Sequence, residues 1–146
     1  MKGTIKTVNA AKVIANTPVL GYVNRRAVRK NIIDRTLERM ECERENAPVS
    51  FEYIAAALSK FDNVTVLYDE QDSALKRFAQ EIESKTSVPC MGLLSQNAMT
   101  IEKAATDAPV VLLLGIDRTK KKLLYCEMEL SAVYNTHVAG MIVLRT

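Results

Sequence analysis

Two places in the chain carry side chains that could act on a nucleotide or a sugar. These side chains are carboxylates and one tyrosine. Tyr68, Asp69 and Asp72 follow a short apolar stretch and precede an amphipathic one. Glu127 and Glu129 lie well downstream, in a second amphipathic stretch. In parallel α/β sheets, ligands bind where strands end and helices begin. These residues are therefore the candidates for a nucleotide or sugar site.

The elements that must position these residues alternate over residues 63–146. Apolar and β-branched runs predict strands, and apolar residues at spacings of three and four predict helices. The strands are expected at 63–68, 88–94, 109–116 and 139–144, and the helices at 72–85, 97–106 and 120–134. The alternation predicts an α/β fold: a flavodoxin-like open parallel sheet of four or five strands with helices on both faces.

Residues 1–62 are expected to form a mainly helical N-terminal extension. Helices are expected at 25–45 and 51–61, the second capped by Ser50, and one or two short strands within 3–23. This division gives an extension over 1–62 and an α/β domain over 63–146, packed together as one compact unit.

Composition excludes several classes of protein. The chain has 146 residues, 48% of them hydrophobic, and a net charge of +3, so nothing indicates nucleic-acid binding. The longest apolar run, 108–116, is far shorter than the ~20 residues of a membrane helix. We therefore expect a cytoplasmic protein with no membrane contact.

Cysteine and histidine usage indicates neither a metal site nor a disulfide framework. The three cysteines, Cys42, Cys90 and Cys126, are widely spaced and form no CxxC pair, which predicts reduced thiols. His137 is the single histidine. Neither GxGxxG nor GxxxxGK[ST] occurs, which disfavours a Rossmann dinucleotide loop and a P-loop.

Residues 63–146 resemble the TIR domain family. The resemblance is carried by VTVLYDEQDS at 64–73, IEKAATDAPVVLLL at 101–114, LLYCEMELS at 123–131 and GMIVLR at 140–145. It implies a domain that binds NAD or a related nucleotide and cleaves its N-glycosidic bond. Glu127 would be the catalytic carboxylate, and Tyr68, Asp69 and Asp72 would line the pocket. NAD would be a substrate or ligand, with no resident cofactor, and the protein would form homo-oligomers.

Periodicity by itself does not choose between Glu127 and Glu129. The expected buried stripe of this helix is Leu123, Cys126, Leu130 and Val133, and the two glutamates lie on its opposite edges. Glu127 is selected by the resemblance alone.

Three alternatives stay open. The first is a non-catalytic protein interaction and assembly module of the same fold. The second is a nucleoside deoxyribosyltransferase-like enzyme, which also uses a glutamate on the corresponding helix as a nucleophile. The third is a flavodoxin-like regulatory domain.

Overall fold

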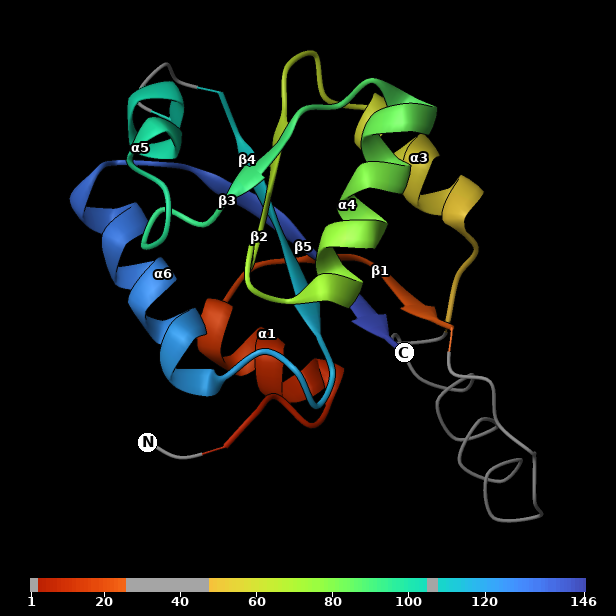
Figure 1. Cartoon of the computed structure of the whole chain (residues 1–146), viewed down its shortest axis with the longest axis horizontal. Coiled ribbons are helices and arrows are strands. Elements are labelled where there is room, and N and C mark those ends of the chain that lie inside the picture. The colour runs from red at the N-terminus through yellow and green to blue at the C-terminus, as the bar shows by residue number, and fades with distance from the viewer. Residues whose placement is uncertain (1–2, 26–47, 105–107) are drawn as a thin grey trace.

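The protein is built around one five-stranded parallel sheet (Figure 1). The computed structural model describes residues 3–25, 48–104 and 108–146. The strands are Val19–Asn24 (β1), Thr65–Tyr68 (β2), Cys90–Gly92 (β3), Val110–Gly115 (β4) and Val138–Arg145 (β5). Their order across the sheet is β1-β5-β4-β2-β3, and each neighbouring pair is parallel.

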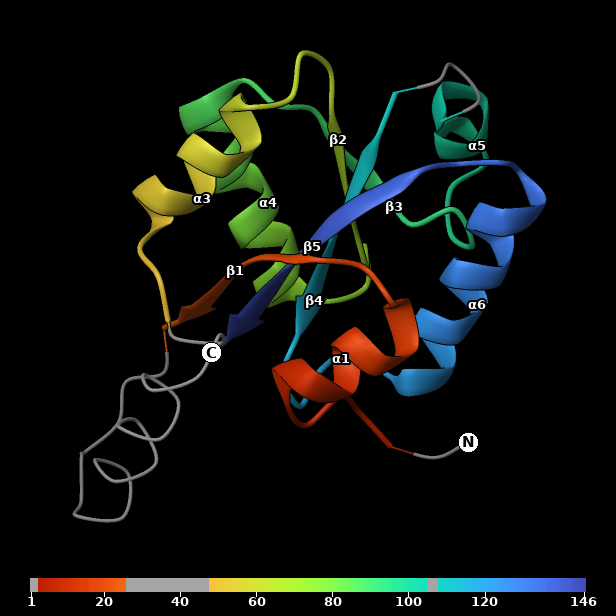
Figure 2. The same ribbon diagram turned by 180° about the vertical axis from the view of Figure 1, so that it is seen from behind.

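Helices cover both faces of this sheet. The described helices are Val8–Ala15 (α1), Phe51–Ser59 (α3), Ser73–Thr86 (α4), Ala98–Ala104 (α5) and Lys121–Val133 (α6). Figures 1 and 2 show α3 and α4 together on one face and α1, α5 and α6 on the other. Each layer has its own buried apolar cluster against the sheet. The predicted α/β class with an open parallel sheet is confirmed.

The strand order is the flavodoxin order with one change in connectivity. Read from the other edge it is β3-β2-β4-β5-β1, which matches the flavodoxin-like order 2-1-3-4-5 in space. The strand in the fifth position is β1, which comes first along this chain. The N-terminal part thus completes the sheet, because β1 pairs with β5.

The expected elements of residues 63–146 are found with small shifts at their ends. The run at 109–116 forms β4, whose six residues are all buried, as expected for a central parallel strand. The strand expected at 88–94 is shorter, because β3 is an edge strand that pairs only with β2 among the described strands.

The N-terminal region is less well anticipated. One strand, β1, begins within 3–23 and ends at Asn24, but residues 8–15 form the helix α1, capped by the Thr7 hydroxyl. The helix expected at 51–61 is α3, with Ser50 as its cap. The helix expected at 25–45 lies almost entirely outside the described residues, since 26–47 are not among them.

Close packing joins α3 to β1. A methyl group added at Gly21 would overlap the Ile54 side chain, which is fully buried. Glycine at this position therefore lets the helix lie directly on the strand. None of the helices in the described part of the chain combines the length and apolar character needed to cross a bilayer.

Candidate functional site

The connections that leave β2 and β4 diverge at the carboxyl edge of the sheet. These strands are neighbours, and β2 continues into α4 on one face whereas β4 continues into α6 on the other. In open α/β sheets such a topological switch point opens a crevice that binds ligands. The two loops concerned are 69–72 and 116–120, which we call the switch-point loops.

Asp72 connects the two switch-point loops. It is the N-cap of α4, where its Oδ1 accepts hydrogen bonds from the backbone N–H groups of Ala74 and Leu75 at 3.0 and 3.1 Å. The same oxygen lies 3.3 Å from Nη1 of Arg118, which belongs to the other loop. The side chain of Asp72 is only 11% exposed. Asp72 thus caps the helix and anchors an arginine at the switch point.

Asp69 and Glu70 are joined to the loop that follows β3. Gln96 donates from Nε2 to Oδ1 of Asp69 at 2.8 Å, and its Oε1 accepts from the Glu70 N–H at 3.0 Å. Asn97 donates to the Glu70 carboxylate at 3.2 Å. The Glu70 side chain lies over Gly92, where an added Cβ would overlap it. These contacts order the first switch-point loop from the β3 side.

Tyr68 faces the α3/α4 layer. It packs against the apolar cluster of that layer and is half-buried. Burial raises the pKa of its phenol, and the negative charges of Glu70 and Glu83 raise it further. Tyr68 therefore stays a neutral donor at physiological pH.

Glu127 lies in the opposite layer and is only 2% exposed. Its two carboxylate oxygens accept hydrogen bonds from the backbone N–H groups of Leu94 at 2.9 Å and Ser95 at 2.7 Å. The structure thus brings Asp69 and Glu127 to the same loop, 93–97, but it separates Tyr68 from Glu127 by the thickness of the sheet. Glu129 is exposed.

The buried face of α6 differs from the expected stripe. Leu124, Glu127 and Ser131 are buried, whereas Cys126 is exposed and Val133 is 73% exposed. The expected stripe was right for Leu123 and Leu130, which are partly buried against the apolar cluster of this layer, and wrong for Cys126 and Val133. Two polar residues, Glu127 and Ser131, lie on the inner face instead, where their hydrogen bonds are satisfied within the protein. Ser131, for example, donates to the Met128 carbonyl at 2.8 Å.

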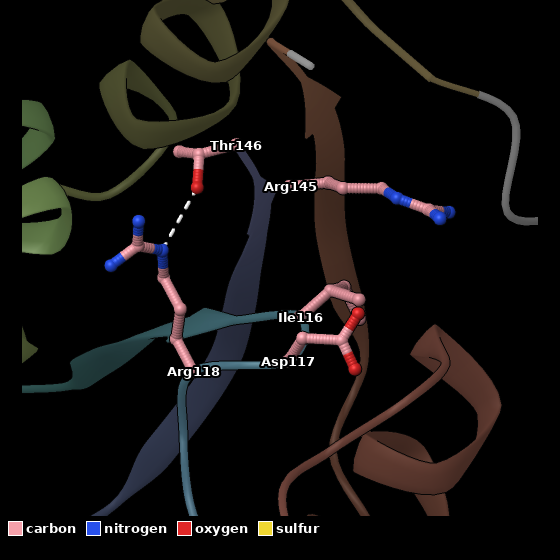
Figure 3. Close-up of a pocket in the computed structure, with 5 residues that line it drawn as sticks. All are labelled: Ile116, Asp117, Arg118, Arg145 and Thr146. Atoms are coloured by element: carbon pink, nitrogen blue, oxygen red, sulfur yellow. Dashed lines mark hydrogen bonds between the residues drawn. The ribbon is translucent and has the colours of Figure 1, made fainter. Parts of the chain in front are cut away.

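A hollow of about 340 Å³ lies beside the second switch-point loop. It is lined by Ile116, Asp117, Arg118, Arg145 and Thr146, from the ends of β4 and β5 (Figure 3). Figure 3 shows Arg118 reaching toward Thr146, with Arg145 projecting to the other side. Arg118 Nε donates to the Thr146 hydroxyl at 2.8 Å. Two arginines and Asp117 thus line the hollow, with the guanidinium groups of Arg118 and Arg145 on opposite sides of it in Figure 3.

The segment 3–6 holds this loop from outside. Ile5, which is fully buried, donates to the Thr119 carbonyl and accepts from the Asp117 N–H, both at 2.8 Å. Lys6 Nζ lies 2.8 Å from Asp117 Oδ1. Asp117 itself has a left-handed φ of 59°, a conformation that aspartate tolerates better than most residues. The second switch-point loop is thus a defined turn.

A second hollow, of about 300 Å³, shares Thr146 with the first. Arg25, Arg77 and Glu81 line it together with apolar residues. Arg25 donates two hydrogen bonds to Glu81, at 2.5 and 2.9 Å, and its guanidinium lies over the Phe78 ring. The hydrogen bond from Arg25 is the main reason why the pKa of Glu81 falls to about 2.

A third hollow, of about 380 Å³, lies at the opposite edge of the sheet. It is lined by residues of the α6 C-terminus and the start of β5, among them Ser131 and His137. Although it is slightly larger, it lies at the amino ends of the strands, where α/β folds seldom bind ligands. We therefore place the candidate site at the carboxyl edge.

Arg118, Arg145 and Asp117 were not among the residues expected from the sequence. A local signal for them is present in the chain, because Asp117 and Arg118 follow the apolar run 109–116 and Arg145 ends the strand β5. The sequence pattern pointed to the polar residues after β2 and on α6, and not to the arginines that follow β4 and end β5.

Metal-ligating side chains do not gather in groups of three or more within residues 3–25, 48–104 and 108–146. Cys90 and Cys126 are free thiols. Burial raises the pKa of Cys90 to about 12, so this thiol is not a nucleophile.

Comparison of the chain with protein-family models, curated proteins and solved structures found no match. The resemblance of residues 63–146 to TIR domains therefore stays a prediction.

Proposed function

We propose that this protein binds a nucleotide, or a related ligand that carries a phosphate group, at the carboxyl edge beside the β2/β4 switch point. The observation that carries this proposal is the contact of Arg118 with Asp72 across the switch point, next to the hollow that Arg118 shares with Arg145. A volume of about 340 Å³ falls within the usual range of small-molecule sites, roughly 300–1,000 Å³.

The side chains of the hollow suit such a ligand. A guanidinium is planar and always charged, and it pairs with phosphate oxygens through two parallel hydrogen bonds. Arg118 and Arg145 bring two such groups to the ends of β4 and β5. Asp117, which is 55% exposed, offers a carboxylate acceptor for sugar hydroxyls. On the first switch-point loop, Asp69 is held by Gln96, and Asp72 contacts Arg118 of the second switch-point loop.

Cleavage of an N-glycosidic bond by Glu127 is a further step that the geometry supports less well. A catalytic carboxylate must reach the sugar, but both oxygens of Glu127 accept backbone hydrogen bonds, and the side chain is 2% exposed. Catalysis would require the 93–97 loop to release it. Nicotinamide release from NAD, measured for the wild type and for Glu127→Gln and Glu129→Gln, tests this step separately from binding.

Isothermal titration of the full chain with AMP and with NAD tests the binding proposal. Arg118→Met and Arg145→Met keep the aliphatic stem and remove the charge, and we expect each to weaken binding about tenfold, the loss of one charge-assisted contact. Lys60→Met is the matched control, because Lys60 is an exposed cation at the end of α3, away from the hollow. Lys60→Met should bind as the wild type does.

Two outcomes would contradict the proposal. One is that neither AMP nor NAD, at millimolar concentration, gives a measurable heat of binding. The other is binding that both arginine variants leave unchanged, which would move the site elsewhere.

The alternatives make different predictions for the same preparation. An assembly module without a ligand predicts concentration-dependent oligomers and no nucleotide binding. A deoxyribosyltransferase predicts base exchange with a deoxynucleoside and none with NAD. No contact described above favours either of them over nucleotide binding.

A further inference from the structure

Glu127 is a buried carboxylate whose role is not explained by ligand binding. It projects from α6 into the protein, where it meets the backbone of the loop that follows β3. Each oxygen accepts one N–H, from Leu94 or Ser95. Hydrogen bonds of this kind, to a charged acceptor in a buried site, are about twice as strong as neutral ones.

The same loop reaches the first switch-point loop at its other end. Gln96 directly follows Ser95 and bridges Asp69 Oδ1 and the Glu70 N–H. The loop between these points is tightly turned, since both Gln96 and Asn97 donate their backbone N–H to the Leu93 carbonyl. A displacement of the Ser95 backbone should therefore also displace Gln96.

We propose that Glu127 is a positioning residue: it fixes the conformation of residues 93–97 and, through Gln96, the placement of Asp69 and Glu70 at the switch point. This role goes beyond nucleotide binding, and it holds for the protein without any ligand. It links α6, on one face of the sheet, to the loop that starts α4 on the other face.

A carboxylate is the side chain that this geometry requires. Two N–H groups converge on two acceptor oxygens, and a glutamine offers one oxygen and one donor. In Glu127→Gln the amide nitrogen would face an N–H group, which leaves one buried donor unsatisfied. The substitution keeps the size of the side chain, so packing around α6 is retained.

Amide hydrogen exchange, followed by NMR on the full chain without ligand, tests the proposal. In Glu127→Gln we expect the Leu94 and Ser95 amides to exchange at least tenfold faster, and the Glu70 amide at least threefold faster. The Leu112 amide in β4 should be unchanged, which separates a local effect from global unfolding. Glu129→Gln, the same substitution at an exposed position of the same helix, should match the wild type.

Gln96→Ala separates the two steps of the linkage. The exchange of the Glu70 amide should become faster in this variant, and the Leu94 and Ser95 amides should stay protected. In the double variant with Glu127→Gln, the effect on Glu70 should be no larger than in Gln96→Ala alone, because both changes act through one path.

Two results would overturn the proposal. If Leu94 and Ser95 stay protected in Glu127→Gln, the carboxylate does not hold the loop. If the Leu94 and Ser95 amides exchange faster but the exchange rate of the Glu70 amide is unchanged, Glu127 holds only its own loop.

A measurement on the wild type covers the case in which Glu127→Gln fails to fold. Through-hydrogen-bond couplings from the Leu94 and Ser95 nitrogens to the Glu127 carboxyl carbon should be present, and their absence would equally reject the role. In that case Gln96→Ala must still release Glu70 for the proposal to stand. A failure of nucleotide binding affects none of these results, since no ligand is used.

Discussion

Glu81 illustrates how one side chain depends on the donors around it. Arg25 donates two hydrogen bonds to its carboxylate, and Lys85, one turn further along α4, lies 3.2 Å away. The pKa of Glu81 is lowered from 4.5 to about 2, first by the hydrogen bond from Arg25. A lowered pKa means that the folded state holds the proton less tightly than the unfolded chain does.

This shift predicts an acid-sensitive contribution to stability. The contribution of Glu81 is complete above the unfolded pKa near 4.5 and is lost as the pH falls toward 2. Glu81→Gln should therefore lower the free energy of unfolding by about 1 kcal/mol at pH 7, as expected for a partly exposed ion pair. The difference from the wild type should shrink between pH 4.5 and pH 2.

Urea unfolding followed by circular dichroism at several pH values measures this difference. Glu129→Gln, which changes an exposed glutamate, is the control and should show no such trend. A Glu81→Gln deficit that stays constant down to pH 2 would show that the ion pair is not its source.

At the residue scale, the sequence identified polar strand ends but not the environment of each side chain. Asp72 was expected at the start of a helix, and it is the N-cap there. Glu127 and Glu129 were equivalent by periodicity, yet one is buried and the other exposed. The difference arises from two N–H groups of a distant loop, and no pattern within α6 contains them.

At the scale of elements, α4 connects the fold to the candidate site. Its first turn begins at the switch point, and its N-cap carboxylate contacts both backbone donors and Arg118. Cap and ion pair can be separated, because asparagine caps a helix about as well as aspartate does but carries no charge.

Two substitutions at Asp72 make this separation. Asp72→Ala should lower the free energy of unfolding by about 1 kcal/mol, since two N–H groups lose their acceptor. Asp72→Asn should restore most of that stability while still removing the charge that faces Arg118. Urea denaturation of the three proteins measures both effects. If Asp72→Asn were as unstable as Asp72→Ala, the ion pair rather than the cap would dominate.

Strands and helices were predictable to different degrees for physical reasons. The run that forms β4 is apolar at every position, and burial on both faces leaves no other assignment. The helix α1 has only eight residues, which is too short for apolar spacings of three and four to repeat, and Val13 on it is 80% exposed. Such a short helix owes its stability to its cap and to packing against α6.

At the scale of the whole molecule, the N-terminal region is part of the sheet. β1 pairs with β5 along Val19 to Asn24, and α1 and α3 cover the two faces beside it. The division expected at residue 62 therefore separates strands that share hydrogen bonds. Removing residues 1–62 would expose the edge of β5, whose residues Met141 to Leu144 are buried.

We expect the fragment 63–146 not to fold by itself. An open apolar edge and two uncovered faces should leave it aggregated or without a cooperative unfolding transition. Size-exclusion chromatography and thermal unfolding by circular dichroism, with the full chain as the control, measure this. A monomeric fragment that unfolds cooperatively would show instead that the first 62 residues are an independent addition.

The sequence by itself determined the class of the fold and most of the element boundaries in residues 63–146. A strand or helix that is buried on one or two faces needs apolar residues at regular spacings, and these spacings can be read along the chain. It also pointed to the first switch-point loop, since a polar run after an apolar strand is a local signal. Only the tertiary structure decided that β1 occupies the far position of the sheet, that Arg118 meets Asp72, and that Glu127 holds the loop after β3. These contacts join residues far apart in the chain, and their partners are chosen by the way the layers pack rather than by any pattern along it.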